Sequence, residues 1–237
     1  MSTVAWITAR GLFGRRRVLL LLPLPILLIV LAVICDAAGV DAREWGAPVI
    51  VGLGLAVLLP VVALIVGTGV LGSEVDDGTI VHILTKPLPR RDIILAKLGV
   101  AVVASAVTAA VPLFVAGVLA DSVRFGLALA VAAALGAVAY SALFLLLSLL
   151  TRRPVLLGLV YILVWEGLLG RFVSGTRVLS IEQYVITVGD RLSPATDILD
   201  PKVGLPVALV MAAIFAVGGT LFAVNRLRSF SMAGETS

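Results

Sequence analysis

Charged residues are scarce in this chain, and hydrophobic residues take their place. Asp, Glu, Lys and Arg together make up 14% of the 237 residues, whereas 61% of the residues are hydrophobic. A typical soluble domain carries about 25% charged residues and fewer apolar ones. With a mean hydropathy of +1.18, the composition excludes an ordinary soluble domain and predicts a polytopic membrane protein.

Side chains suited to catalysis or metal binding are also scarce. Cys35 is the only cysteine and cannot form an intramolecular disulfide, and His82 is the only histidine. A lone histidine rules out paired-histidine metal sites and histidine-based catalytic relays. None of Lys86, Lys97 and Lys202 ends a glycine-rich loop that could cradle phosphates. We therefore expect that the chain by itself is not an enzyme, hydrolyses no ATP, and binds no metal and no cofactor.

Long uncharged runs are what the chain has in abundance. A bilayer core about 30 Å thick requires roughly 20 apolar residues in a helix, so such runs can be counted along the sequence. Six candidates emerge, and they leave no linker to a second domain. We therefore predict an all-α integral membrane protein with one domain over residues 1–237. The predicted spans are residues 18–35, 46–72, 96–120, 125–150, 154–170 and 204–224.

The distribution of Lys and Arg predicts the orientation, because short positively charged loops stay cytoplasmic. Six spans place both termini on the same side, which is then the cytoplasmic side of the cell membrane. The pI near 9.7 reflects this topology and contact with anionic lipids, so nucleic acid is not an expected partner. Twelve of the eighteen basic residues fall on the predicted cytoplasmic side: Arg10, Arg15, Arg16, Arg17, Lys86, Arg90, Arg91, Lys97, Arg152, Arg153, Arg226 and Arg228.

Two segments outside the spans have an amphipathic pattern. Ahead of the first span, apolar residues recur at near-helical spacing beside Arg10 and Arg15–Arg17, which predicts an interfacial helix; a disordered start stays open as the alternative. Between spans five and six, Ser180 and Gln183 form a capping-box pair ahead of an amphipathic stretch that ends at Leu192. We predict a helix lying on the outer surface, which either caps a translocation route or packs on the outer ends of the bundle.

Glu166 is the one clear carboxylate inside a predicted span. Its sequence context is YILVWEGLLGR, next to Trp165 and less than two helical turns from Arg171. An ionisable residue within a span usually faces protein or water and often marks a pathway. Three interpretations stay open: Glu166 lies at the outer interface with Trp165, pairs with a basic group that holds the bundle together, or lines a substrate route.

The long polar island between the second and third spans is the most informative segment. It covers residues 74–97, EVDDGTIVHILTKPLPRRDIILAK. The apolar residues of Ile80–Leu84 suit a short cytoplasmic helix that docks in a partner's groove. Lys86–Pro89 then forbids a continued helix, and the next helix begins at Arg90 or Arg91. The alternative is an interfacial re-entry helix whose basic side chains reach the headgroups.

The order of residues in this island resembles the membrane subunits of type-2 ATP-binding-cassette exporters. The shared order is an acidic residue, Gly-Thr, an apolar pair, Lys-Pro, an arginine step, Ile-Ile-Leu and a lysine that opens the third span. The resemblance implies that residues 74–97 form a cytoplasmic coupling segment which docks on a motor subunit. The residues it assigns to ATPase coupling are Glu74, Asp77, Gly78, Thr79, Ile80, Ile83, Leu84, Pro87, Arg90, Arg91 and Lys97.

The same resemblance implies a function and a set of partners. The chain would be a permease subunit that moves a substrate, in the export direction, using ATP and magnesium held by a separate ATP-binding-cassette subunit. A second permease copy, identical or a sister chain, would enclose the route within the lipid bilayer. The competing hypothesis is a secondary transporter that works without a motor. Such carriers usually show internal repeats and several ionisable groups at mid-membrane depth, and here only Glu166 qualifies. The sequence does not identify the substrate.

Overall fold

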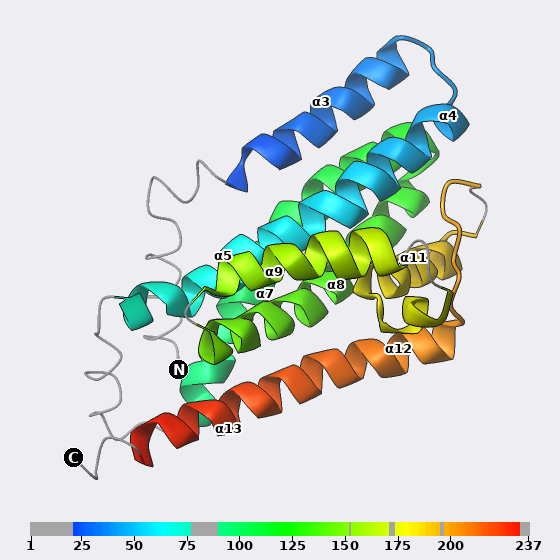
Figure 1. Ribbon diagram of the computed structural model, residues 1–237. Coiled ribbons are helices and arrows are strands. Elements are labelled where there is room, and N and C mark those ends of the chain that lie inside the picture. Colours follow the sequence, from blue (N-terminus) through cyan, green and yellow to red (C-terminus); the bar gives the residue numbers. More distant parts are fainter. Residues whose placement is uncertain (1–20, 77–89, 152, 171–173, 195–196, 233–237) are drawn as a thin grey trace.

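The computed structural model describes residues 21–76, 90–151, 153–170, 174–194 and 197–232. Within these residues the chain is helical and contains no strand (Figure 1). Several helices continue directly into one another, with π-helical hydrogen bonding in η1, η2 and η4 and a 3-10 turn in η3. The helices are α3 (Pro23–Ala37), α4 (Ala42–Gly46), η1 (Ala47–Leu58), α5 (Leu59–Asp76), α7 (Arg90–Ala120), α8 (Val123–Leu150), α9 (Pro154–Val160), η2 (Tyr161–Leu169), η3 (Ser174–Leu179), α11 (Ile181–Leu192), α12 (Leu205–Ala213), η4 (Ile214–Gly218) and α13 (Gly219–Met232).

The helices confirm a multi-pass membrane protein. In the part of the chain that the structure describes, four helical stretches are long and apolar enough to cross a bilayer: Ala42–Val70, Arg91–Ala120, Val123–Leu150 and Leu205–Arg226. Two further apolar helices, Pro23–Ala37 and Pro154–Leu169, are shorter and coincide with the predicted first and fifth spans. The predicted count of six spans therefore stays a prediction. The predicted interfacial helix over the first residues lies outside the described part of the chain.

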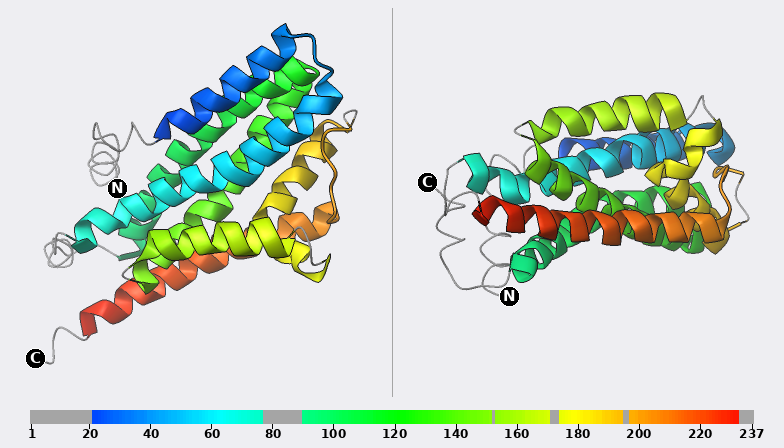
Figure 2. Two further views of the ribbon diagram at one scale, coloured as in Figure 1. Left: turned by 45° about the horizontal axis from the view of Figure 1, so that its top comes forward. Right: turned by 60° about the horizontal axis from the view of Figure 1, so that its bottom comes forward.

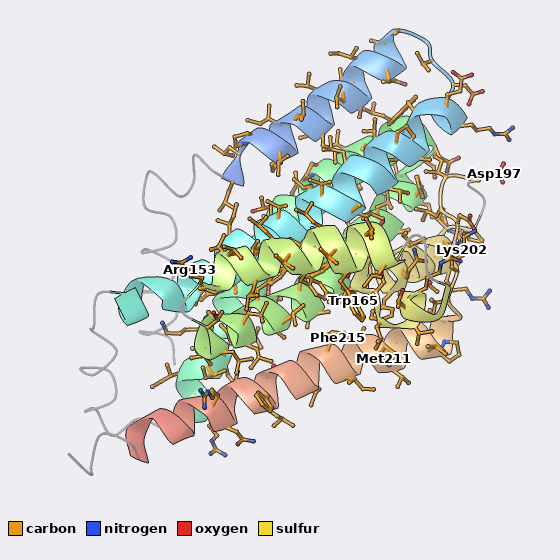
Figure 3. The ribbon with its side chains drawn as sticks, viewed as in Figure 1. Arg153, Trp165, Asp197, Lys202, Met211 and Phe215 are labelled. Carbon is orange, nitrogen blue, oxygen red and sulfur yellow. The ribbon has the colours of Figure 1, made fainter. Side chains whose placement is uncertain are left out.

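The bundle has two ends that differ in the elements they contain (Figures 1 and 2). We call the end at which α5 ends, α7 begins and α13 ends the stem end. The opposite end, which contains α4, η3 and α11, is the α11 end. Figure 3 shows Arg153 near the stem end and Asp197 and Lys202 at the α11 end, with Trp165, Met211 and Phe215 between them. Charged residues at both ends and apolar residues between them are the distribution expected of a helix bundle that spans a bilayer.

Helix α8 lies at the centre of the bundle and packs against α5, α7, α11 and α13. Small residues allow these helices to approach closely, as is usual between membrane helices. A Cβ added to Gly126 would lie 2.6 Å from the carbonyl oxygen of Phe114, so α7 and α8 cross almost backbone to backbone. Ser122 begins α8 as its N-cap, and its Oγ accepts a hydrogen bond from the Phe125 amide at 3.2 Å.

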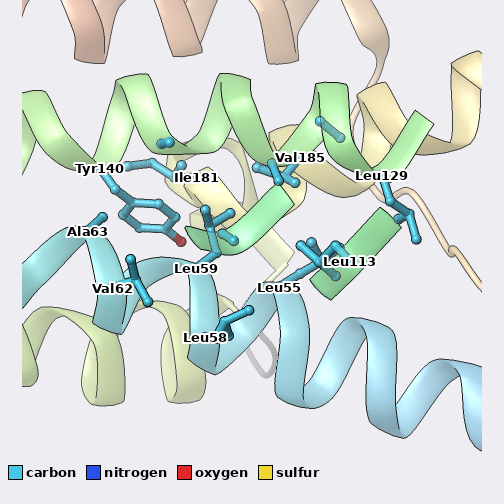
Figure 4. Close-up of a cluster of buried hydrophobic side chains, with 14 of the residues drawn as sticks. Leu55, Leu58, Leu59, Val62, Ala63, Leu113, Leu129, Tyr140, Ile181 and Val185 are labelled. Atoms are coloured by element: carbon cyan, nitrogen blue, oxygen red, sulfur yellow. The ribbon is translucent and has the colours of Figure 1, made fainter. Parts of the chain in front are cut away.

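The core is continuous from α5 and η1 through α7 and α8 to α11. Figure 4 shows Leu55, Leu59 and Val62 packed beside Tyr140 of α8 and Ile181 of α11. The outward surface is also apolar: Val103, Val107 and Val111 recur every four residues on α7 and are all exposed. Lipid tails can cover such a stripe at little cost, because a helix bonds most of its backbone polar groups internally.

Candidate functional site

The predicted coupling segment begins and ends in helices at the stem end of the bundle. Helix α5 continues through Glu74 to Asp76, and α7 begins at Arg90, the first of the two predicted start positions. The side chain of Arg91 is exposed and forms an ion pair with its neighbour Asp92 at 3.6 Å. The other predicted coupling residues lie outside the described part of the chain: Asp77, Gly78, Thr79, Ile80, Ile83, Leu84 and Pro87.

Lys97 is buried inside the bundle and is not part of an exposed surface. Its side chain is buried, with 1% of the residue exposed, and its Nζ donates to the backbone carbonyl of Val70 at 2.8 Å. Val70 belongs to α5 and Lys97 to α7, so this bond joins the two helices from which the predicted coupling segment emerges. A charged donor to a carbonyl is among the stronger protein hydrogen bonds. Lys97 therefore joins the two helices, and its predicted part in ATPase coupling stays a prediction.

A small cluster of buried side chains extends this connection to two more helices. Ile94, one turn before Lys97 on α7, packs with Leu145 and Leu149 of α8 and with Ala223 and Val224 of α13. These five residues are buried at the stem end. The start of α7 is thus in contact with α5, α8 and α13, and the four helices are joined where the predicted coupling segment meets the bundle.

Glu166 lies at the other end of the bundle, and its carboxyl group is buried with 2% of the residue exposed. Its Oε1 accepts hydrogen bonds from the Tyr140 hydroxyl at 3.0 Å, the Tyr161 hydroxyl at 3.0 Å and the Ile181 amide at 2.9 Å. Its Oε2 accepts one from the Ser180 hydroxyl. The carboxyl group thus accepts four hydrogen bonds: one from α8, one from η2 itself and two from the start of α11. We call these five residues the Glu166 hub.

The start of α11 is shaped by the residue that the sequence marked as its cap. Ser180 is the N-cap, and its Oγ accepts from the Gln183 amide at 3.3 Å while donating to Glu166. The reciprocal half of the predicted capping box is absent from these contacts, because the Gln183 side chain accepts from the Lys202 amide at 3.4 Å. A carboxyl group at the first amide of a helix is favourably placed, since a helix N-terminus attracts negative charge.

Helix α11 lies at one end of the bundle and packs among other helices, whereas its predicted position on the outer side of the membrane stays a prediction. It packs against α8, α12 and η1, and Ile181, Tyr184 and Val185 are fully buried. The contact with α8 is close, because a Cβ added to Gly136 would lie 2.6 Å from a methyl carbon of Val185. Sequence reasoning identified the amphipathic pattern, but a buried face against protein and a buried face against lipid produce the same pattern.

Aromatic residues surround the Glu166 hub. The rings of Tyr140 and Phe144 stack with centroids 5.9 Å apart, and Phe144 meets Tyr161 edge-on at 6.3 Å. The third tyrosine, Tyr184, donates its hydroxyl to the Val178 carbonyl. Burial, followed by the charge of Glu166, raises the pKa of the Tyr184 hydroxyl above its ordinary value, so this group stays a donor. All three tyrosines of the chain therefore lie at or beside the hub.

The geometry bears on the three interpretations of Glu166. Its partners in the described residues are three hydroxyls and a backbone amide, and its side chain is enclosed by protein. The neighbouring Trp165 is half-buried, and its Nε1 donates to the Leu179 carbonyl at 3.2 Å. This arrangement favours a residue that holds the bundle together, with hydroxyl donors in the place of a basic group. Sequence reasoning did not identify Tyr140 and Tyr161 as partners of Glu166. The available signal was that a carboxylate inside a span needs hydrogen-bond donors and that the chain has only three tyrosines.

Comparison with known protein families establishes the class. A family model described as ABC-2 family transporter protein matches residues 15–172, well over half of the chain. The chain belongs to this family and is the membrane (permease) subunit of a type-2 ATP-binding-cassette transporter. Subunits of this family are transport subunits that generally pair with an ATPase subunit. No curated protein matches the chain. The matched region includes Lys97 and Glu166 and ends before α11 begins.

Proposed function

We propose that this permease exports its substrate with energy from ATP that is hydrolysed by a separate nucleotide-binding subunit docked on residues 74–97. In this proposal the stem end and both termini face the cytoplasm, and the α11 end faces the outside of the cell membrane. ATP and magnesium are bound by the partner subunit. Two permease copies, identical or sister chains, enclose the substrate route.

The contact between Lys97 and Val70 carries this proposal. A docked subunit can move the bundle only if a push on the coupling segment reaches the spans as a unit. The buried Lys97 bond joins the two helices that flank the segment, and the Ile94 cluster joins them to α8 and α13. These four helices pack against one another in a part of the bundle that lies directly beside the segment. The arrangement supports a segment that transmits force.

The filled interior supports a route between two copies. The fully buried core residues include Tyr140, Phe125, Phe144, Leu55, Leu58, Leu59 and Leu64. Side chains packed in this way leave a single bundle a poor channel, whereas the surface between two copies can open and close. A closed twofold dimer is the commonest assembly for such a chain.

The Glu166 hub argues against the competing secondary transporter. A carboxylate has about four lone-pair positions for donors. Glu166 already accepts four hydrogen bonds, three at Oε1 and one at Oε2. A translocated cation would have to displace these donors from a buried position. The arrangement therefore supports a structural group more than the exchangeable ion site that a motor-independent carrier needs.

A co-purification assay tests the proposal. The tagged full-length chain is isolated in detergent, and its ATPase partner is identified as the co-purifying chain with a phosphate-binding loop. We expect ATP hydrolysis by the pair and none by the permease alone. Gly78→Asp and Ile80→Asp should insert normally into the membrane but lose the partner, because a charge replaces the small or apolar surface. Arg43→Ala, an exposed change at the α11 end, is the matched control and should retain the partner.

Two results would contradict the proposal. The first is ATP turnover by the purified permease without any partner. The second is retention of the ATPase subunit by both charged variants. Orientation is tested separately: in a Cys35→Ser background, a cysteine introduced at Thr79 should react with a membrane-impermeant maleimide only after the cells are opened. A cysteine at Asp121 should react in intact cells.

A further inference from the structure

We propose that the Glu166 hub is a latch that fastens the α11 end of the fifth span to a unit formed by α8 and α11, and that this latch opens during the transport cycle. The proposal rests on the proposed function only for its second half. The fastening itself is a property of this chain.

Helices α8 and α11 form one packed unit. Val185 fits against Gly136, and a Cβ added to Gly189 would lie 3.1 Å from Leu199 and 3.6 Å from the Ala132 methyl group. The far end of α11 is also joined to α8, because the Arg124 Nε donates to the Leu192 carbonyl at 3.2 Å. Contacts therefore run along α11 from its first residue to its last. This unit is well suited to stay together while a neighbouring helix moves.

The α11 end of the fifth span, helix η2, is held differently. Leu163 is 68% exposed and Leu168 is 57% exposed, whereas Ile162 and Glu166 are the buried residues of this helix. Three of the five aliphatic side chains of η2 are exposed, so its apolar attachment depends mainly on Ile162 and on the edge-on contact of Tyr161 with Phe144. The buried polar contacts of Glu166 add to this limited attachment.

The donors of the hub divide unequally between the two sides. Tyr140 belongs to α8, and Ser180 and Ile181 belong to the start of α11, so these three bonds bridge η2 to the unit. Tyr161 lies on η2 together with Glu166, and its bond bridges nothing. Opening of the latch would break the three bridging bonds and keep the fourth. This asymmetry distinguishes a latch from a polar cluster that only fills space.

The chemistry of the donors suits a contact that opens and closes. All three bridging donors to Glu166 are neutral: the hydroxyls of Tyr140 and Ser180 and the backbone amide of Ile181. Breaking a buried pair of full charges strands an uncompensated charge, which is strongly unfavourable. A carboxylate that loses neutral hydroxyls can accept water at the membrane surface in their place. The latch is thus firm when dry and can be released when water enters the α11 end.

Distance measurements by double electron–electron resonance test the latch in the full-length chain reconstituted in nanodiscs. In a Cys35→Ser background, spin labels replace the exposed residues Leu168 on η2 and Arg191 on α11. Tyr140→Phe should raise the ratio of a longer-distance population to the latched one about five-fold, as expected for the loss of one hydrogen bond. Glu166→Gln should raise it further, because the amide replaces an acceptor with a donor that faces donors.

Two tyrosine variants are matched controls that lose the same hydroxyl group. Tyr161→Phe removes a bond that does not bridge, and Tyr184→Phe removes a nearby hydroxyl that bonds Val178, so both should leave the distances unchanged. The fastening is refuted if Tyr140→Phe leaves the distances unchanged, or if the control variants lengthen them equally. Size-exclusion profiles confirm folding, and Tyr140→Phe decides the outcome should Glu166→Gln fail to fold.

A second measurement tests the opening during transport. The permease with the same two spin labels and no hub substitution is then combined with the ATPase subunit. ATP should increase the same longer-distance population that Tyr140→Phe produces. A distance that never responds to ATP would refute the opening and leave the fastening in place. Failure of the proposed function has a different signature, namely the absence of an ATPase partner while the variants still change the distances.

Discussion

Among the described residues, Lys97 at the stem end and Glu166 at the α11 end are both buried ionisable side chains, and they find different kinds of hydrogen-bond partner. At the stem end, Lys97 directs its ammonium group to a backbone carbonyl of the neighbouring helix. At the α11 end, Glu166 collects hydroxyl and amide donors from three elements. A backbone acceptor is fixed to its helix, whereas hydroxyl groups can rotate and exchange partners. The comparison indicates a rigid connection beside the coupling segment and a releasable one at the opposite end.

Removal of the Glu166 carboxyl group should have the largest effect on this contrast. Glu166→Ala leaves four buried donors without their acceptor, and each buried donor left unsatisfied costs about 1 to 3 kcal/mol. We expect a large fall in thermal unfolding temperature in detergent and in the yield of monodisperse protein. Glu44→Ala, an exposed change at the same end, should melt like the wild type. Wild-type stability for Glu166→Ala would show that the hub contributes little.

Replacement of Lys97 should separate stability from coupling. Lys97→Met keeps the length of the side chain and removes a buried charge, so the free energy of unfolding should change by less than about 1.5 kcal/mol. The connection between α5 and α7 is nevertheless lost, and ATP-driven transport or ATP-dependent distance changes should fall several-fold. Lys202→Met is the matched control, because Lys202 is exposed and lies at the other end. Full coupling in Lys97→Met would contradict the role assigned to this contact.

The crossing of α7 and α8 offers a test that involves neither buried charge. Gly126→Ala places a methyl group 2.6 Å from the Phe114 carbonyl, which is backbone and cannot rotate away. Overpacking of this kind costs about 1 to 3 kcal/mol, and unfolding in denaturant should begin at lower concentration. In Gly99→Ala, on the partner helix α7, the added methyl group meets nothing within 4 Å, and the variant should be neutral or slightly stabilising. Equal behaviour of both variants would mean that the helices separate easily at this point.

Loss of the exposed ion pair at the α11 end should have the smallest effect. Arg43 and Asp197 lie 3.8 Å apart with side chains 78% and 84% exposed. Exposed pairs of this kind are worth about 0.5 kcal/mol or less, so Asp197→Ala should shift the melting temperature by no more than a degree or two. A larger shift would indicate that the polar contacts at the α11 end act as a network. The two ends would then differ in the number of their polar contacts more than in how deeply those contacts are buried.

The sequence predicted the helical class correctly, for physical reasons that can be named. Uncharged runs of sufficient length leave the backbone no alternative to helix in a bilayer, and Ser180 marks the start of α11 because its hydroxyl serves as a cap. Glu166 was identified as unusual because a carboxylate inside an apolar run requires partners. These inferences depend on local sequence and on the solvent, and both are visible in one chain.

The partners of these residues could not be predicted, because they come from distant positions. Tyr140 lies 26 residues before Glu166, and Val70 lies 27 residues before Lys97. Neither bond leaves a local pattern. A uniformly apolar helix also gives no periodic signal that separates its protein face from its lipid face, so the exposure of η2 was hidden. The amphipathic pattern of α11 was visible, but it did not show whether the apolar face contacts protein or lipid.

The position of Trp165 gives the permease a built-in optical reporter. Its indole Nε1 is bonded to the Leu179 carbonyl, one residue before the cap of α11. Indole emission shifts to longer wavelength when the ring moves from an apolar contact into water. The chain has three tryptophans, so a Trp6→Phe, Trp45→Phe background would leave Trp165 as the sole emitter. Its fluorescence would then follow any separation of the fifth span from the cap of α11 in real time, without an added dye.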